Sequence, residues 1–168
     1  MPAASARRGF GDGAAVTGLA PARALLAVAA VVDVALHARP TPVSARALAA
    51  RHALPPRHLE TVLQALVHHG ILKGVRGPRG GYALARERRR ISAGAVARAA
   101  LAGERADPGR AEPTARSTLV TAVVEPLAAA ATEAFLAHLD AVSIDDLCAR
   151  AEAAEVFGPR SAGGDFAI

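Results

Sequence analysis

The sequence is poor in residues on which several classes of protein depend. Its 168 residues include one cysteine, one tyrosine, four phenylalanines and no tryptophan. So few aromatic side chains argue against a reader of single-stranded nucleic acid, because such proteins stack bases on aromatic platforms. The six histidines are scattered, and no pair of them has the spacing of a closed zinc site with sulfur partners. We therefore predict no bound metal.

The sequence also lacks the short motifs of common enzymes. It has neither a Gly-x-Ser-x-Gly elbow nor a His-Glu-x-x-His pair, and the acids of its C-terminal half show no preferred pairing. The glycine-rich segment 77–81 lacks the G-x-x-x-x-G-K-[ST] or G-x-G-x-x-G spacing of a loop that binds nucleotide phosphates. An enzyme would require a catalytic cleft for which the sequence gives no sign, so we predict that the protein is not an enzyme.

The longest apolar run of the sequence is not expected to span a membrane. This run, 24–36, contains Asp33 and is too short to cross a bilayer. We expect it to be a core helix with four residues on its buried face: Leu25, Val28, Val32 and Leu36. Residues 1–13 are small, polar and basic without the apolar centre of a signal peptide, so we expect a disordered tail there. The predicted location is the cytoplasm, away from any membrane.

A helix with two contrasting faces is predicted after Pro55 and Pro56, which suit a helix start, and before Gly70, which suits a helix end. Apolar residues at helical spacing form one stripe: Leu59, Val62, Leu63, Leu66 and Val67. At about 100° per residue, four polar residues line the opposite face: Arg57, Thr61, Gln64 and His68. Arginine suits guanine and glutamine suits adenine in the DNA major groove. Any amphipathic surface helix has a polar face, so this helix alone does not establish DNA binding.

The flanking segments favour a winged helix–turn–helix. Residues 43–52 predict a short helix capped by Ser44, and only residues 53–56 separate it from the next helix. So tight a turn is typical of the unit whose second helix enters the major groove. Downstream, the turn 77–81 joins two strand-like runs. Arg76 and Arg79 lie at its tip, where a wing can reach phosphate or a narrow minor groove.

These elements together define the predicted DNA-binding surface. Base readout is expected from the polar helix face, and backbone or minor-groove contact from the wing. Tyr82, at the base of the wing, is expected either to pack or to contact phosphate. The complete predicted set is Ser44, Arg46, Arg57, His58, Thr61, Gln64, His68, Arg76, Arg79 and Tyr82.

Charge is divided unevenly along the chain. Residues 37–90 contain eleven arginines and lysines against two acids, a net charge of +9. Residues 101–168 contain five arginines against eleven acids, a net charge of −6. The basic part can displace counterions from a polyanion, and the acidic part cannot. Because the basic residues are not gathered on one long amphipathic helix, nucleic acid is favoured over a membrane surface as their partner.

These motifs resemble those of a known family of bacterial regulators. The similarity lies in Val43-Ser44 before a helix, in the His-Gly-Ile-Leu ending of the next helix, in the wing string VRGPRGGYAL at 75–84 and in Ile91-Ser92 at a further helix start. In these places the chain is similar to the BadM/Rrf2 family, which includes IscR, NsrR and CymR, and the similarity runs from about residue 17 to residue 153. It implies a mainly α-helical fold with a small β-hairpin wing, and a homodimer on a pseudo-palindromic operator.

One departure from the family pattern concerns the cofactor. The resemblance implies that members sensing iron, nitric oxide or redox state hold an iron–sulfur cluster through three cysteines, in the loop before the dimerisation helix. The corresponding loop here, roughly 102–116, contains no cysteine, and Cys148 lies far along the chain. One sulfur per chain cannot replace that ligand set, so we predict no cluster. Cys148 is expected to be a small buried residue on the face of Ile144 and Leu147.

The C-terminal half predicts a long helix over 117–139, with Pro126 kinking it or ending its first segment. Its apolar stripe could be core or subunit interface, and an interface is favoured because little else lies nearby to cover it. The stripe comprises Val120, Val123, Val124, Leu127, Ala131, Phe135 and Leu139. The resemblance implies that 135–139 ends a dimerisation helix and that 143–147 begins a closing short helix.

The predicted organisation has five parts: a disordered basic tail (1–16), a winged helix–turn–helix (17–101), a loop (102–116), the dimerisation and closing helices (117–157) and a flexible tail (158–168). The predicted function is sequence-specific regulation of transcription by a homodimer on double-stranded DNA, expected to be repression. The sequence does not indicate which effector, if any, the protein senses. The alternative is a winged-helix module for protein–protein contact with weak or no DNA binding, which a duplex-binding assay over a salt series would distinguish.

Overall fold

The computed structural model describes residues 20–105 and 117–158. In chain order these ranges form α1 (Ala20–His37), α2 (Ala45–Arg51), α3 (Pro56–His68), β1 (Leu72–Val75), β2 (Gly81–Leu84), the 3-10 turn η1 (Arg88–Arg90), α4 (Ala93–Arg105), the π turn η2 (Val120–Val124), α5 (Glu125–Asp140) and α6 (Ile144–Ala153). The predicted fold class, mainly helical with a small hairpin, is confirmed. The tail expected over 1–16 and most of the expected loop and C-terminal tail lie outside the described residues.

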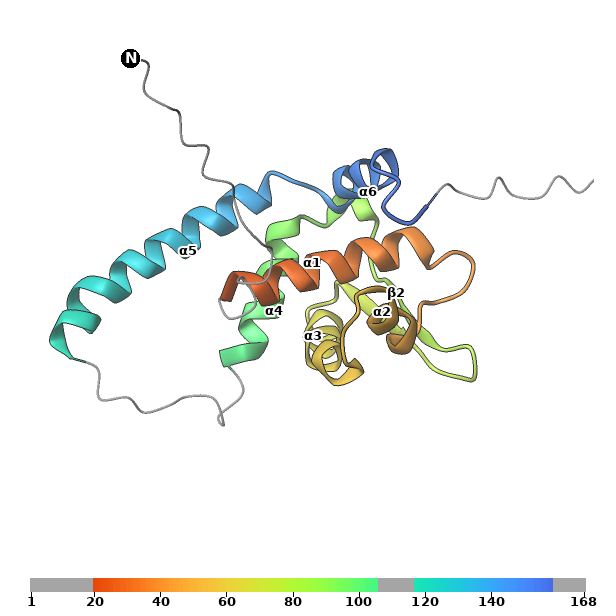
Figure 1. The fold of residues 1–168 in the computed structure, drawn as a ribbon, viewed down its shortest axis with the longest axis horizontal. Helices are drawn as coiled ribbons and strands as arrows, with labels where there is room; N and C mark the ends of the chain where they lie inside the picture. The colour runs from red at the N-terminus through yellow and green to blue at the C-terminus, as the bar shows by residue number, and fades with distance from the viewer. Residues whose placement is uncertain (1–19, 106–116, 159–168) are drawn as a thin grey trace, which may run out of the picture.

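The described chain has two regions, which we call the body and the arm. The body consists of α1 to α4, the hairpin, η1 and α6, and the arm consists of residues 117–140, which hold η2 and α5 (Figure 1). In Figure 1 the arm runs away from the body toward the left, while the hairpin points to the lower right. Helix α4 continues to Arg105, past the boundary expected at residue 101.

Helix α1 lies at the centre of the body, packed against α4 and also against α2, α3, α6 and β2. The predicted core helix is therefore confirmed, and of the four residues assigned to its buried face Val28 and Val32 are buried and Leu36 is partly buried against the core. Leu25 is 46% exposed, whereas Ala24 and Ala27 are fully buried. Alanine carries little hydrophobic contrast, so periodicity does not reveal that the neighbouring helices approach the alanine side of α1 closely.

Helix α3 buries one side against the body, as its pattern predicts. Leu59, Leu63 and Leu66 are fully buried, and together they anchor the helix in the common core. Val67 was expected in the same stripe but is 38% exposed. It lies at the edge of the stripe, about 100° from Leu66, beyond the width that the neighbouring helices cover.

The ends of α2 and α3 follow their local chemistry. Ser44 caps α2, its Oγ accepting a hydrogen bond from the Ala47 N–H at 3.2 Å. Pro56 is the first residue of α3, and Gly70 ends it with a φ of +63°, in the left-handed region that glycine adopts readily. In the turn between the helices Ala53 has a φ of +51°, a conformation that costs about 1 kcal/mol for a residue with a Cβ.

The hairpin is joined to the start of α2 as well as to itself. Its strands pair antiparallel, from Leu72 opposite Leu84 to Val75 opposite Gly81. Tyr82 exchanges two backbone hydrogen bonds with Val43, at 2.8 and 2.9 Å. A Cβ on Gly81 would lie 2.4 Å from the Val43 carbonyl oxygen, so a residue without a side chain is required for this approach. The wing is thus held at a set position beside α2.

The proline of the arm is accommodated by a widened turn. The Glu125 N–H donates to the Val120 carbonyl five residues back, the pattern of a π turn, and α5 begins at Glu125 with Pro126 in its first turn. The break expected near Pro126 thus takes this form. After α5, Ser143 and Asp146 form a capping box that starts α6, the predicted closing helix.

Candidate nucleic-acid interface

The four residues predicted to read bases share one exposed face. Arg57, Thr61, Gln64 and His68 are exposed on α3, on the side opposite the buried leucines. His58 is exposed too, about 100° around the helix from Arg57. Glu60 also lies exposed on this side, about 60° from Arg57, a position that helical spacing predicts although Glu60 is not among the predicted site residues. A carboxylate on this face would accept hydrogen bonds and repel phosphates.

The wing and the start of α2 add basic and polar groups. Arg76 and Arg79 are exposed in the turn between β1 and β2, and Arg46 is exposed in the first turn of α2. Ser44 is exposed, and although its Oγ accepts from the Ala47 N–H, its hydroxyl proton and second lone pair can still bond a ligand. Tyr82 is only half-buried and packs against the core, so of its two expected roles packing is observed.

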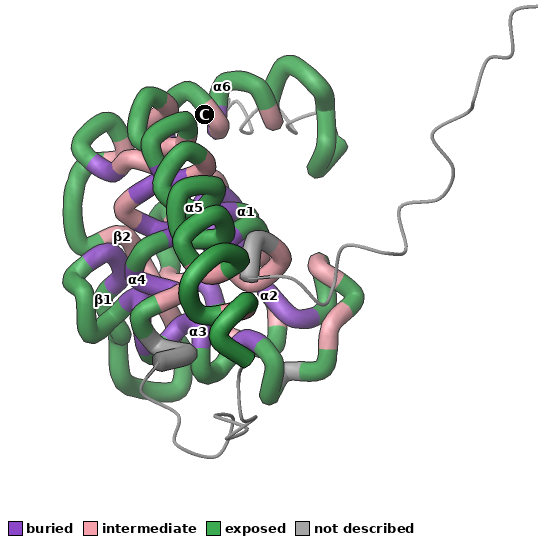
Figure 2. The backbone as a smooth tube through the Cα atoms, turned by 90° about the vertical axis from the view of Figure 1, so that its left-hand side faces the viewer, coloured by how far each residue is buried: buried purple, intermediate pink, exposed green. Residues whose placement is uncertain are grey.

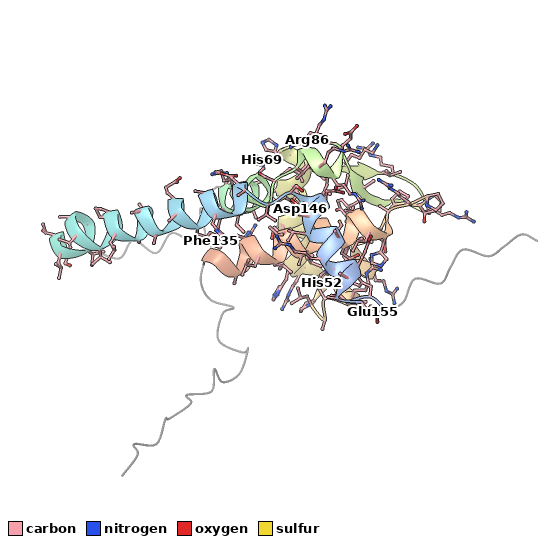
Figure 3. The ribbon with its side chains drawn as sticks, turned by 90° about the horizontal axis from the view of Figure 1, so that it is seen from above. His52, His69, Arg86, Phe135, Asp146 and Glu155 are labelled. Atoms are coloured by element: carbon pink, nitrogen blue, oxygen red, sulfur yellow. The ribbon has the colours of Figure 1, made fainter. Side chains whose placement is uncertain are left out.

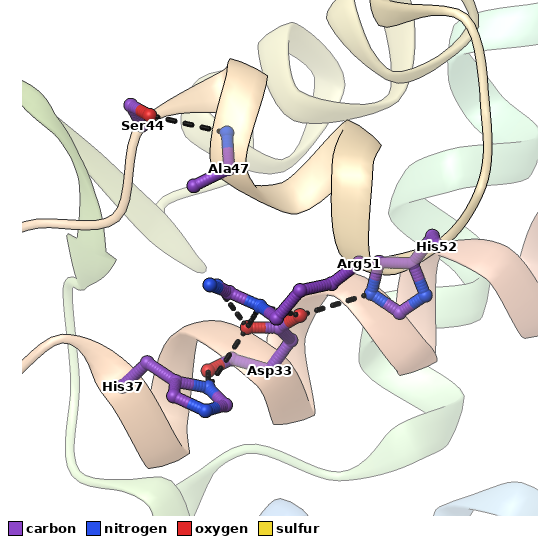
Figure 4. A network of polar contacts seen from close by, with 6 residues as sticks. All are labelled: Asp33, His37, Ser44, Ala47, Arg51 and His52. Atoms are coloured by element: carbon purple, nitrogen blue, oxygen red, sulfur yellow. Dashed lines mark hydrogen bonds and ion pairs between the residues drawn. The ribbon is translucent and has the colours of Figure 1, made fainter. Parts of the chain in front are cut away.

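A buried ionic cluster braces the helix–turn–helix from behind (Figure 4). Asp33 of α1 is fully buried. Arg51, the last residue of α2, donates hydrogen bonds to this carboxylate. Its Nε lies 3.0 Å from Oδ1 and 2.8 Å from Oδ2, and its Nη2 lies 2.6 Å from Oδ1. His37 Nδ1 lies 2.9 Å from the Asp33 carbonyl oxygen and 3.0 Å from its Oδ1, so a proton on Nδ1 faces two acceptors.

His52 completes this cluster at the turn. Its Nε2 is buried and lies 3.2 Å from Asp33 Oδ2, close enough for an ion pair when the ring is protonated, but without the geometry of a hydrogen bond. The cluster therefore connects the middle of α1 to the last residue of α2 and to the turn that leads into α3. A buried charge needs such partners, and two of the partners of Asp33, Arg51 and His52, come from the segment that leads into α3.

Several basic residues of segment 37–90 are engaged within the protein and do not add freely to a DNA-facing charge. Arg51 pairs with Asp33, Arg88 pairs with Asp145 of α6, and Arg86 donates to the Gly70 carbonyl at 3.1 Å. Arg89 and Arg90 approach Glu87 at 3.6 and 3.7 Å. The remaining basic residues are exposed: Arg39, Arg46, Arg57, Lys73, Arg76 and Arg79. Asp33 and Asp145 lie outside segment 37–90 and neutralise Arg51 and Arg88, so the charge that a polyanion meets is lower than the net +9 of the segment.

The arm presents a second, apolar surface. Leu119, Val123, Val124 and Leu127 are 48–71% exposed, and Figure 2 shows the arm exposed over most of its length. Toward its C-terminal end the stripe turns onto the body: Phe135 and Leu139 are half-buried, and Leu136, which the pattern did not single out, is buried against Ala24 and Ala97. Residues 120–140 are long and apolar enough to cross a membrane, with a mean hydropathy of 1.4 and 6% of the window buried, but one helix of this kind is weak evidence of a membrane span.

The residues present do not fit an iron–sulfur cluster. Cys148, the one cysteine of the sequence, is fully buried in α6 beside Ile144, as expected. Burial raises the pKa of its thiol, which disfavours the thiolate that a metal requires. Within residues 20–105 and 117–158 no group of three or more His, Cys, Asp or Glu side chains is placed to hold a metal ion.

Comparison with known proteins places this arrangement among transcriptional regulators. Residues 21–150 match the model of the Rrf2 family, described as an iron-dependent transcriptional regulator. The chain is 39% identical over 70 residues to the HTH-type transcriptional regulator IscR of Serratia proteamaculans, and 40% identical over 70 residues to IscR of Sodalis glossinidius. Each match covers 42% of this chain, and the chain spans less than half the length of these curated relatives, 43% and 42%.

Solved structures agree over a larger part of the chain. IscR of T. potens has a TM-score of 0.56 and 28% identity, covering 79% of this chain and 88% of that one. CymR, the global cysteine regulator of B. subtilis, has a TM-score of 0.54 and 23% identity, covering 76% and 94%. The second likeness, at this level of identity, concerns the fold alone.

Proposed function

The chain belongs to the Rrf2 family of transcriptional regulators, and we propose that it binds a pseudo-palindromic DNA operator as a homodimer and represses transcription. The observation that carries the proposal is the exposed polar face of α3, which stands beside a basic wing and in front of a buried ionic cluster. Membership of a regulator family favours DNA as the partner of this face. The proposed location is the cytoplasm, where an operator is accessible.

In the proposed complex α3 and the wing contact different parts of the DNA. Arg57, Thr61, Gln64 and His68 contact base edges in the major groove, with Ser44, Arg46 and His58 beside them. Arg76 and Arg79 contact the sugar–phosphate backbone or the minor groove. The bracing of α2 by Asp33 supports this division, because base readout requires a recognition helix held in one orientation.

The proposed dimer forms through the exposed part of the arm. Leu119, Val123 and Leu127 present an apolar surface that is costly to leave in water. A second copy related by a two-fold axis would cover it with the same residues and place two recognition helices on one face of the DNA. The arm has three acids and no arginine or lysine, which favours a protein partner over anionic lipid.

We propose further that no iron–sulfur cluster takes part, because the sequence has one cysteine and Cys148 is buried in α6. Purified protein should be colourless and should bind its operator equally with or without iron and reductant. A brown preparation with stoichiometric iron would show that groups other than cysteine hold a cluster, and this part of the proposal would be withdrawn.

The central test is selection of duplexes from a random DNA library by the purified full chain, followed by binding measurements over a salt series. We expect an inverted repeat to be enriched. We also expect the affinity for DNA to fall as a power of salt concentration, because phosphate contacts release counterions. Enrichment of no sequence, with binding no stronger than that of an unrelated protein, would favour the alternative of a module for protein–protein contact.

A further inference from the structure

The root of the arm is held to the body by a compact polar junction. Asp140, the last residue of α5, accepts hydrogen bonds from both terminal nitrogens of Arg98 on α4, each at 2.6 Å. Ser92, which caps α4, donates to Asp140 Oδ1 at 3.4 Å. We call Ser92, Gly94, Arg98 and Asp140 the α4–α5 joint. Seen from above, the arm extends outward from this end of the body, with Phe135 near its root (Figure 3).

The joint leaves no space between the two helices. A Cβ on Gly94 would lie 2.0 Å from Asp140 Oδ1 and 2.9 Å from the Asp140 backbone nitrogen, so glycine is required for this approach. Two backbone hydrogen bonds of 2.8 Å support it, from the Ala93 N–H to the Val142 carbonyl and from the Ile144 N–H to the Ile91 carbonyl. These contacts therefore fix the position of the end of α5 against the start of α4.

The ion pair between Arg98 and Asp140 is expected to contribute little to the stability of the fold. The side chains of Arg98 and Asp140 are 45% and 41% exposed, and exposed ion pairs contribute little to folding. An acid at the C-terminal end of a helix also opposes the helix dipole, although the same carboxylate lies at the favourable N-terminal end of α4. Hydrogen bonding by Arg98 lowers the pKa of Asp140, so the pair stays ionised. A two-pronged arginine–carboxylate contact mainly fixes direction.

We propose that the α4–α5 joint sets the angle at which the arm leaves the body, and thereby selects the half-site spacing of the operator. This rests on the proposed function, because the arm must carry the dimer contact for its angle to matter. Arg98 and Asp140 are in this view positioning residues, and neither is assigned a contact with DNA.

The length of the arm makes the joint sensitive. The exposed apolar residues 119–127 precede Asp140 by 13 to 21 residues, which corresponds to about 20–30 Å of helix. A change of about 10° at the joint would move the dimer contact by about 3–5 Å, close to the ~3.4 Å rise of one base pair. Each added base pair also turns the second half-site by about 35° around the DNA axis. A small change in the angle of the arm would therefore shift the two DNA-binding surfaces relative to each other by about one base-pair step.

The test compares spacing preferences. Duplexes carry the half-sites selected by the wild-type chain, separated by the selected spacing and by one base pair less, one more and two more. We expect the wild type to prefer one spacing by about tenfold. In Arg98→Ala the preference should fall to about threefold or move to another spacing, with the half-site sequence unchanged. Arg98→Lys keeps the charge without the two-pronged contact and should fall between them.

Arg150→Ala is the matched control, because it also removes one exposed arginine but lies in the last turn of α6 and is not one of the joint residues. It should keep the wild-type spacing profile, whereas general weakening of the protein would alter the affinity for all spacings alike. If folded, dimeric Arg98→Ala and Arg98→Lys both keep the wild-type profile, the joint proposal is wrong while the proposed function stands. If the wild type is monomeric or shows no paired half-sites, both proposals fail.

Discussion

The body and the arm both contain many apolar residues, but they use them in opposite ways. In the body most apolar residues of α1, α3 and α4 are buried in the core, whereas in the arm Val123, Val124 and Leu127 are 48–71% exposed. The body also carries the basic residues, while residues 117–140 have no arginine or lysine. The body therefore has its own buried core and an exposed basic surface, whereas the apolar residues of the arm are left exposed, which is why we propose a second copy as their cover.

The largest effect is expected from a substitution that tests whether the stability of the body depends on the buried carboxylate of Asp33. Asp33→Asn keeps the shape of the side chain but leaves Arg51 without its anionic partner, and we expect a loss of about 3 kcal/mol in the free energy of unfolding. Urea denaturation followed by circular dichroism measures it. Asp145→Asn, which disturbs the half-exposed pair with Arg88, should cost much less. Equal losses in the two variants would contradict the bracing role of Asp33.

The next effect tests whether the arm depends on a second copy. Val124→Asp places a charge in the proposed dimer contact, and we expect it to weaken dimerisation by about 3 kcal/mol. Light scattering at micromolar concentration should find the variant monomeric, with lower operator affinity although no DNA-contacting residue has changed. Ala129→Asp is the control, because Ala129 is exposed about 200° around α5 from Leu127. A Val124→Asp protein that remains dimeric with full affinity would place the contact elsewhere.

A smaller effect tests base readout by the body. Gln64→Ala and Arg57→Ala should each reduce operator affinity by about 1–3 kcal/mol and relax the base preference at one position of each half-site. Binding to single-base variants of the selected operator measures this. Glu133→Ala, an exposed change on the arm, should leave every preference intact. An unchanged preference in Gln64→Ala would mean that the assigned face of α3 does not read bases.

The smallest effect tests the wing. Arg79→Ala should weaken binding to all sequences alike and reduce the slope of log affinity against log salt by about one unit, since one phosphate contact is lost. Titrations of an operator and of an unrelated duplex at several salt concentrations give both slopes. Arg150→Ala on α6 carries the same charge change and should leave them unaltered. A loss confined to the operator would show instead that Arg79 reads sequence.

Sequence patterns predicted the elements of the interface better than the packing around them. The leucine stripe of α3, its start at Pro56 and its end at Gly70 were predicted because each depends on residues a few positions apart. The burial of α1 was predicted less well, since it depends on which neighbours reach its alanines. Val67 was misplaced for the same reason: the width of a buried stripe is set by the covering helices.

The partners of charged residues could not be predicted at all. Asp33 was noted as an interruption in an apolar run, yet its partner Arg51 lies 18 residues away on a different helix. Arg98 and Asp140 are 42 residues apart, and no motif connects them. Phe135 and Leu139 were grouped with Val123 and Leu127 by spacing, although the body half-buries only the former two. A stripe of regular spacing does not tell which part of it will meet the chain's own core.

The sequence by itself determined the helix caps, the turn of the wing, the polar face of α3, the division of charge and the absence of a cysteine ligand set, because each follows from residue chemistry over a few neighbouring positions. The tertiary structure alone decided which arginines pair with acids of distant segments, how far the buried side of α1 extends onto its alanines, and where the arm leaves the body at Gly94. These depend on contacts between segments distant in the chain, and such contacts exist only once packing has brought the segments together.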